Sequence, residues 1–230
     1  MQPHSLGQNS IHHQPESSLL ELPHRSEIHW ARKIWHMGGV FIMFLAYQFM
    51  PFWMSLAVLM IAWFAFVPAD LLRQNNPVLN RRLISWFKPI IRKCEIDRIS
   101  GSSFLISGVL IIDCLFSKEI VSIALLFLAF ADPIASFFGI KFGKHKIFGH
   151  KSLEGSLAAY VVCVICSFSY LYAMGFEAQR ILYFSLVAGF VGAVSELMTF
   201  WDLDDNFTLP IFSSIGMLAL MYVIPLGIAS

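Results

Sequence analysis

The chain has 230 residues, of which 57% are apolar, and only 13% are charged, about half the charged fraction of a typical soluble domain. Together with a mean hydropathy of +0.67, this composition indicates an integral membrane protein. The formal net charge of +1 excludes a nucleic-acid-binding protein whose affinity depends on an overall basic field.

The chain begins with a polar segment, residues 1–27, whose composition is typical of a disordered tail. The segment has no apolar run of the kind that marks a cleavable signal peptide, so we expect none. We expect a single transmembrane catalytic domain over residues 28–230, preceded by this tail.

Apolar stretches of about the length that crosses a bilayer follow along the rest of the chain, since a spanning helix needs about 20 mainly apolar residues. Seven stretches come near this length: 34–50, 52–72, 103–117, 119–138, 153–174, 181–199 and 208–228. The stretch 103–117 is the shortest of them. The sequence therefore predicts an all-α, multi-pass helical bundle with about seven transmembrane helices.

The basic residues between these stretches predict the orientation of the bundle. They concentrate in the N-terminal segment and in the connectors 73–102 and 139–152, which seven spans would place on one side of the membrane. Only Lys118 and Arg180 fall on the other side. Because basic connectors remain in the cytoplasm, we expect a cytoplasmic N-terminus and an external C-terminus.

Acidic residues in or near the spans are candidate functional residues, because an ionisable group is costly at membrane depth. Near the outer end, Asp113 is expected to snorkel to the membrane boundary or to pair with Lys118. Carboxylates that face basic connectors would suit a site that takes a magnesium-bound nucleotide from the cytosol. Among the acidic residues in or near the spans, those on the predicted cytoplasmic side are Asp70, Asp132, Glu154, Glu196, Asp202, Asp204 and Asp205.

The most informative segment is FADPIASFFGIKFGKHKIFGHKSLEGS, residues 130–156. Pro133 follows Asp132 directly and interrupts the helical hydrogen-bond ladder at membrane depth, which is tolerated only beside a protein-lined cavity. Gly139 and Gly143 then recur at four-residue spacing. This spacing permits the close approach of another helix or of a ligand.

The connector after this span combines glycines with lysines, among them Lys144 and Lys151, and Ser152 and Glu154 mark the start of the next helix. Backbone amides, ammonium groups and a helix N-terminus together would suit a triphosphate. The connector lacks the G-x-x-x-x-G-K-[ST] pattern of a P-loop. The alternative is that its lysines are only topology anchors on the cytoplasmic side.

Two further groups of residues lie on the same predicted side. Arg32 and His36 share a face at the start of the first span, beside Lys33, where anchoring at the membrane boundary is the alternative function. The sixth span ends shortly after Glu196. The last span then begins near Asp205-Asn206, a pair that would also serve as a helix cap.

Three segments together resemble the polyprenol kinase family, which comprises dolichol kinase, phytol kinase and the CTP-dependent diacylglycerol kinases. They are RKIWHMGG from Arg32, ADPIASFFGIKFGKHKIFGHKSLEGS from Ala131 and DNFTLP from Asp205. The resemblance extends over most of residues 28–215, and it implies that the γ-phosphoryl group of CTP, or of another nucleotide, is transferred with Mg²⁺ to a lipid alcohol. The middle segment is also similar to phosphatidate cytidylyltransferases. The ending DDNFTLP, however, lacks the late paired aspartates with an intervening arginine of that second family.

We therefore expect a lipid-alcohol kinase that acts at the cytoplasmic leaflet on a polyprenol, a phytol-like alcohol or diacylglycerol. Nucleotidyl transfer to phosphatidate is the alternative, and a membrane transporter is a more distant one. The expected partners are the lipid alcohol, the nucleotide and membrane lipids, without nucleic acid.

The expected site residues fall into three groups. The expected catalytic residues are Asp132, Arg32, Lys33 and His36. The expected nucleotide-binding residues are Gly139, Gly143, Lys144, Lys151, Ser152, Asp205 and Asn206. The expected Mg²⁺ ligands are Asp132, Glu154 and Glu196.

Overall fold

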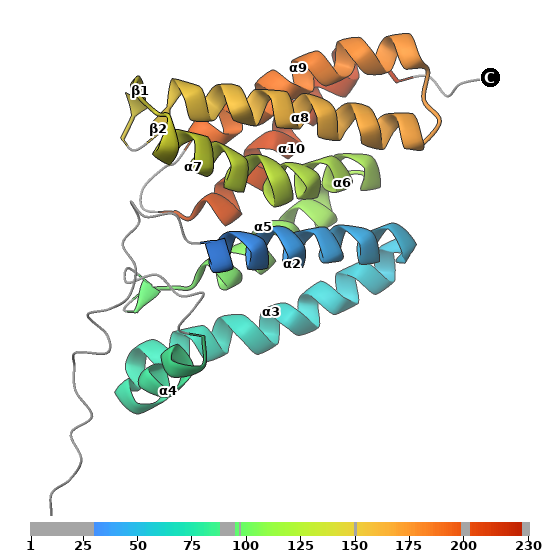
Figure 1. The fold of residues 1–230 in the computed structure, drawn as a ribbon. Helices are drawn as coiled ribbons and strands as arrows, with labels where there is room; N and C mark the ends of the chain where they lie inside the picture. Colours follow the sequence, from blue (N-terminus) through green and yellow to red (C-terminus); the bar gives the residue numbers. More distant parts are fainter. Residues whose placement is uncertain (1–29, 88–94, 97, 150, 199–202, 227–230) are drawn as a thin grey trace, which may run out of the picture.

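The computed structural model describes residues 30–87, 95–96, 98–149, 151–198 and 203–226. Most of its helices run along one common direction and form a bundle (Figure 1). The helices are α2 (Trp30–Phe49), α3 (Phe52–Asn75), α4 (Pro77–Phe87), α5 (Gly101–Leu115), α6 (Lys118–Leu126), the π-helical turn η2 (Phe127–Ala131), α7 (Asp132–Lys141), α8 (Leu153–Ala173), α9 (Ala178–Leu197) and α10 (Asp205–Val223).

The centre of the bundle is the continuous helix that α6, η2 and α7 form together. Along the most apolar 18 residues of this helix, 72% of the residues are buried, whereas along the most apolar 18 residues of α3 only 17% are buried. The helices α2, α5, α8 and α10 contact this central helix. Side chains such as Val121, Leu125 and Phe127 are completely buried there, so the protein core lies along α6 and η2.

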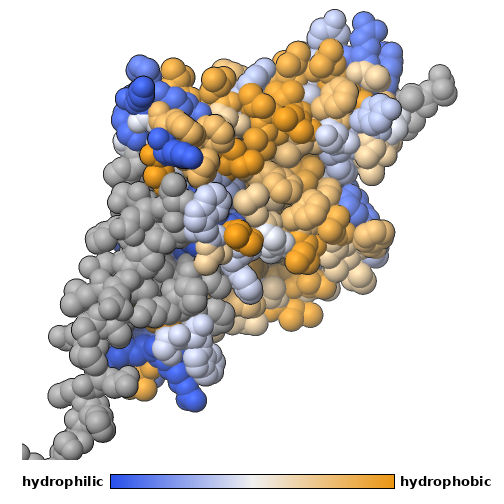
Figure 2. Space-filling view, viewed as in Figure 1, coloured by the Kyte–Doolittle hydropathy of each residue, from blue (hydrophilic) through white to orange (hydrophobic). Residues whose placement is uncertain are grey.

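The outer faces of the bundle carry large apolar side chains, which form a broad hydrophobic surface on the face shown in Figure 2. Trp53, Ile61 and Phe190 are more than 60% exposed. A soluble protein rarely exposes so much apolar surface, but the hydrocarbon core of a bilayer would cover it. The structure thus supports the prediction of a multi-pass helical membrane protein.

The predicted number of spans is confirmed only in part. Among the described residues, five helices are long and apolar enough to cross a membrane: α3, the central helix Lys118–Lys141, α8, α9 and α10. Of the other two predicted spans, α5 has only 15 residues, about 22 Å, and α2 carries Arg32, Lys33 and His36 in its first two turns. A total of seven spans and a cytoplasmic N-terminus stay predictions.

Two elements within the connectors were not predicted. One is the short helix α4, and the other is a hairpin of two antiparallel strands, β1 (Lys146–Phe148) and β2 (Lys151–Ser152), which adds a small sheet to the expected all-α fold. Gly149 lies between the strands with φ of +54°, in the left-handed region that glycine adopts without steric cost. The hairpin places Lys151 directly before α8.

Most of the predicted site residues lie at one end of the bundle. The hairpin, the start of α2, the start of α10 and α4 all lie at this end, opposite the turn between α8 and α9 (Figure 1). The predicted tail, residues 1–27, lies outside the described residues, so its separation from a catalytic domain over 28–230 stays a prediction.

Candidate active site

A buried ion-paired group lies where β2, the end of α9 and the start of α10 meet. The Nζ atom of Lys151 lies 2.6 Å from Oε1 of Glu196 and 3.1 Å from Oδ2 of Asp205. The Glu196 side chain is only 3% exposed, so its charge depends on this lysine. Burial alone would lower the pKa of Lys151, but the charges of Asp205 and Glu196 outweigh burial and raise that pKa above its ordinary value.

Asp132 completes this group as the first residue of α7. The charge of its half-buried carboxylate acts on Lys151, Glu196, Asp205 and also Arg32. Throughout the part of the chain that the structure describes, no hydrogen bond or ion pair engages that carboxylate. We call Lys151, Glu196, Asp205 and Asp132 the Lys151 cluster. It gathers three carboxylates around one ammonium group.

The excess of carboxylates fits a divalent cation that arrives with a nucleotide. Mg²⁺ in such sites keeps several waters and is bound through one or two carboxylates together with the phosphates. Within the described ranges, no three or more His, Cys, Asp or Glu side chains are arranged to hold a metal ion by themselves. Asp132, Glu154 and Glu196 therefore do not form a ready-made three-carboxylate site, and their function as metal ligands stays a prediction.

The backbone before Asp132 is widened into the π-helical turn η2. The backbone N–H of Asp132 donates to the carbonyl of Phe127, five residues earlier. The next bond of this kind would join residue 133 to Leu128, but Pro133 has no N–H to donate. Nε2 of His36 lies 3.0 Å from that Leu128 carbonyl oxygen and can satisfy it. Pro133 thus frees a backbone group, as predicted, but the helix continues past it.

Arg32 and Lys33, near the start of α2, contact residues of other segments. Nζ of Lys33 donates to the carbonyl of Pro133 at 3.0 Å, directly beside Asp132. Nη2 of Arg32 pairs with Oε1 of Glu95 at 2.7 Å. The sequence reasoning missed Glu95, because its pairing with Arg32 joins two distant segments. The structure brings the start of α2 against the helix of Asp132, and the catalytic functions of these residues stay predictions.

The predicted glycines lie where α7 crosses the start of α8. A Cβ atom at Gly143 would lie 2.2 Å from the carbonyl oxygen of Gly139 and 2.7 Å from Oγ of Ser152. The same hydroxyl caps α8 by accepting from the backbone N–H of Gly155 at 3.2 Å. Of the two alternatives left open for the glycines, the structure shows close helix approach. Nucleotide contact by Gly139, Gly143 and Ser152 stays a prediction.

Glu154 lies in the first turn of α8 and contacts the connector. Its Oε1 atom lies 2.8 Å from Nδ1 of His145, and its carboxylate also accepts from the backbone N–H of that histidine. No described contact joins Glu154 to Asp132 or Glu196. Lys144 is exposed in the same connector, so it has room to move toward a ligand.

At the start of α10, two neighbouring aspartates make different contacts: one caps the helix and the other faces Lys151. Asp204 caps the helix, because its Oδ1 accepts from the backbone N–H of Asn206 at 3.0 Å. Asp205, the next residue, faces Lys151 instead. The buried Asn206 donates to the carbonyl of Gly101 at 3.1 Å. Asp202 lies outside the described residues.

The prediction for Asp113 is wrong. This carboxylate is buried and accepts from the hydroxyl groups of Tyr47 at 2.9 Å and Ser55 at 3.1 Å. Lys118 donates instead to the backbone carbonyls of Gln48 and Met50. The partners of Asp113 come from α2 and α3, 66 and 58 residues away, which local spacing does not reveal.

Comparison with known proteins identifies the family. The chain is 37% identical over 172 residues to CTP-dependent diacylglycerol kinase 1 of Schizosaccharomyces pombe, and the match covers 69% of this chain and 77% of that protein. It is 31% identical over 210 residues to the protein of the same name from Saccharomyces cerevisiae, covering 83% of this chain and 72% of that protein.

A third protein of this name, from Eremothecium gossypii, is 32% identical over 167 residues, which cover 64% of this chain and 53% of that protein. No protein-family model matches the chain, and no solved structure matches it. The relatives from Schizosaccharomyces pombe and Saccharomyces cerevisiae, at 37% and 31% identity, are covered over more than two thirds of their length. The chain therefore belongs to the family of CTP-dependent diacylglycerol kinases, which confirms the resemblance of its three motifs to this group of lipid kinases.

Proposed function

We propose that the protein is a multi-pass membrane enzyme that transfers the γ-phosphoryl group of CTP to a lipid alcohol, with diacylglycerol as the substrate. The names of the relatives support this donor and this acceptor. Within the molecule, the proposal depends on one observation. The Lys151 cluster brings an ammonium group, ion-paired with Glu196 and Asp205, close to the carboxylate of Asp132, which forms no hydrogen bond or ion pair with the described residues.

Phosphoryl transfer needs positioning and charge stabilisation more than covalent help from the protein. The lipid hydroxyl oxygen attacks the γ-phosphorus, the bond from that phosphorus to the bridging oxygen breaks, and CDP leaves. The hydroxyl proton passes to a base, either Asp132 or water. We propose that Asp132 either accepts a hydrogen bond from the attacking hydroxyl or contributes to Mg²⁺ binding. Both functions need a carboxylate oxygen that is not already engaged. Mg²⁺ bound with the nucleotide would neutralise charge on its phosphates.

The cations of the site are proposed to bind the phosphates. Glu196 and Asp205 hold the Lys151 ammonium group in place from two sides, so it acts as a fixed point charge. Arg32 and Lys33 bring further positive charge from α2. The remaining proposed nucleotide contacts are Gly139, Gly143, Lys144, Ser152, Asp205 and Asn206, and the further proposed metal ligands are Glu154 and Glu196.

We also propose that this end of the bundle faces the cytoplasm. The test uses a variant whose four native cysteines are replaced by serine and a membrane-impermeant thiol reagent on intact cells. Lys144→Cys should be protected until the cells are opened, whereas Glu177→Cys, at the opposite end, should react at once. Equal labelling of both positions would contradict the proposed orientation.

The position of a radioactive label tests the reaction itself. Membranes that contain the protein are incubated with CTP labelled at the γ- or the α-phosphate, together with diacylglycerol, prenols, phytol and phosphatidate. We expect γ-label in diacylglycerol phosphate, release of CDP and no pyrophosphate. Transfer of α-label to phosphatidate with release of pyrophosphate would indicate a cytidylyltransferase. Folded protein that labels none of these lipids would favour a transporter.

A further inference from the structure

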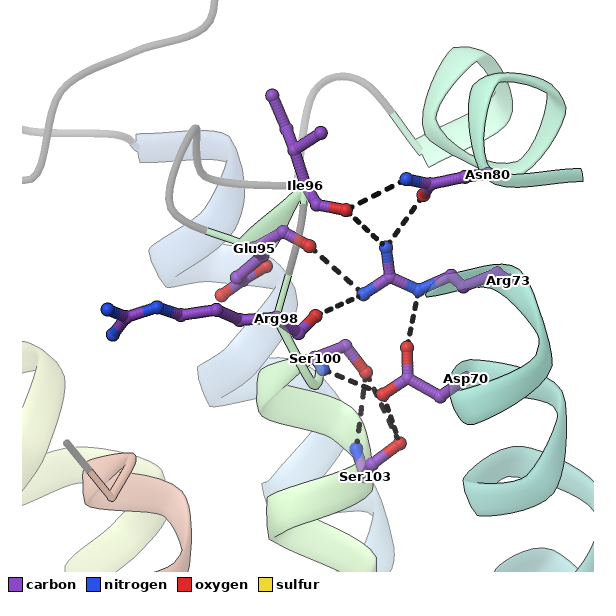
Figure 3. A network of polar contacts seen from close by, with 8 residues as sticks. All are labelled: Asp70, Arg73, Asn80, Glu95, Ile96, Arg98, Ser100 and Ser103. Atoms are coloured by element: carbon purple, nitrogen blue, oxygen red, sulfur yellow. Dashed lines mark hydrogen bonds and ion pairs between the residues drawn. The ribbon is translucent and has the colours of Figure 1, made fainter. Parts of the chain in front are cut away.

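A second polar cluster lies beside the candidate active site, centred on Arg73 in the last turn of α3 (Figure 3). A guanidinium group has five N–H donors, and the contacts of Arg73 match that number. Its buried side chain crosslinks α3, the start of α4 and the segment that leads into α5. Nε donates to Oδ1 of Asp70, Nη1 to Oδ1 of Asn80 and the carbonyl of Ile96, and Nη2 to the carbonyls of Glu95 and Arg98.

Asp70 extends the cluster into the start of α5. Its Oδ2 atom accepts from the backbone N–H of Ser100 and from Oγ of Ser103, each at 2.7 Å. We call Asp70, Arg73 and their hydrogen-bond partners the Asp70–Arg73 clamp. The clamp holds the backbone carbonyls of Glu95, Ile96 and Arg98 and also the first turn of α5.

The other side of the clamped backbone faces the active site. The Glu95 carboxylate, attached to a backbone whose carbonyl Arg73 holds, pairs with Nη2 of Arg32 at 2.7 Å. Gly101, next to the clamped Ser100, is packed tightly. A Cβ atom there would lie 2.8 Å from Nδ2 of Asn206 and 3.3 Å from Nη2 of Arg32. Arg73 is thus connected to Arg32 through a single intervening residue, Glu95.

We propose that Arg73 is a positioning residue for the nucleotide, acting through Glu95 to hold the Arg32 guanidinium group where it meets the phosphates. This inference depends on the proposed function of Arg32. Compared with apolar side chains of the same volume, a buried ion pair adds little net stability. A guanidinium group with five hydrogen-bond partners, however, holds those partners in one geometry. A change at Arg73 should therefore impair CTP binding in particular, by displacing Glu95.

The test is a double-mutant cycle of Arg73→Lys and Arg32→Ala, measured as the KM for CTP. Lysine keeps the charge beside Asp70, but its three donors cannot hold all five partners. We expect Arg73→Lys alone to raise the KM for CTP by about five- to twentyfold, with the KM for lipid and kcat within about twofold. In the Arg32→Ala background, the same change should raise the KM less than about twofold further.

Asp113→Asn is the matched control, because it alters a buried, hydrogen-bonded carboxylate distant from the clamp. It should leave the KM for CTP unchanged. If Arg73→Lys does not fold, Asn80→Ala removes a single partner of Arg73 and repeats the cycle more mildly. Effects that multiply fully in the double variant, or equal changes in both KM values, would overturn the positioning function. A wild-type protein without CTP-dependent transfer would instead refute the proposed function, and this inference with it.

Discussion

The two polar clusters at this end of the bundle differ in how completely their groups are paired. In the Asp70–Arg73 clamp, Arg73 makes five donor contacts and both oxygens of Asp70 accept hydrogen bonds. In the Lys151 cluster, three carboxylates surround one ammonium group, and Asp132 has no hydrogen-bond partner among the described residues. A satisfied network stabilises one geometry, whereas an incomplete one can accept a ligand. The proposed function gives these clusters different tasks: the first would hold the backbone and Arg32 in place, and the second would bind the reacting groups.

The largest expected effect is that of Asp132→Asn. Because no described group pairs with this carboxylate, its loss should leave the thermal stability of the detergent-solubilised protein almost unchanged. Transfer from CTP should fall by about 10²- to 10⁴-fold, as expected when a general base or a metal-binding carboxylate is removed. Initial rates at saturating CTP and lipid measure this loss.

Asp113→Asn is the opposite case and serves as the control. Its carboxylate accepts from Tyr47 and Ser55, so the change should lower thermal stability while turnover per folded molecule stays near that of the wild type. If both aspartates reduced turnover equally at matched folding, burial rather than chemistry would account for Asp132.

Lys151→Ala should have the next largest effect, on both stability and nucleotide binding. It leaves Glu196 buried without a counter-charge, which costs about 3–5 kcal/mol when one partner of a buried pair is removed. The double variant Lys151→Met/Glu196→Gln removes both charges and should recover much of that stability. Its KM for CTP should remain high. Denaturation and CTP titration measure the two effects, and recovery of the wild-type KM would show that the ammonium group does not bind phosphate.

The sequence predicted well those features that depend on neighbouring residues. The predicted span 153–174 and the observed helix Leu153–Ala173 nearly coincide, because one apolar run sets the length and Ser152 provides the cap. The loss of a backbone hydrogen bond at Pro133 was also predictable, since proline always removes a backbone donor.

Features that depend on pairing between distant segments could not be predicted in this way. The partners of Asp113 and the pairing of Glu95 with Arg32 exist only after the helices pack. The assignment of Asp70 to a structural clamp had one local signal, an arginine three residues later on the same helix face. That signal alone does not show that Arg73 also holds three backbone carbonyls of the connector.

A smaller effect tests whether His36 only stabilises the fold or also takes part in the reaction. His36→Ala should leave the Leu128 carbonyl without its partner and destabilise the protein by about 1–3 kcal/mol. In a Pro133→Ala background, the new backbone N–H can reach this carbonyl, so the same change should cost less. Thermal denaturation of the four proteins measures this coupling. A loss of kcat that persists in the Pro133→Ala background would indicate that His36 also takes part in the reaction.

The smallest expected effect is that of Glu154→Gln. The amide keeps an oxygen that can accept from the backbone N–H of His145, so folding should be unaffected. If Glu154 contributes to Mg²⁺ binding, it does so after leaving His145, and its loss should raise the Mg²⁺ concentration for half-maximal activity by only about two- to fivefold, against the far larger effect expected for Asp132.

His145→Ala is the matched control for Glu154→Gln, because it releases the Glu154 carboxylate without removing it. It should leave the Mg²⁺ requirement unchanged or lower it. Activity measured across a Mg²⁺ titration separates the two variants. If Glu154→Gln abolished transfer as completely as Asp132→Asn, both carboxylates would have to reach the reacting phosphate. The Lys151 cluster would then extend from α7 across the connector into the first turn of α8. The pairing of Glu154 with His145 would be a resting arrangement that nucleotide binding breaks.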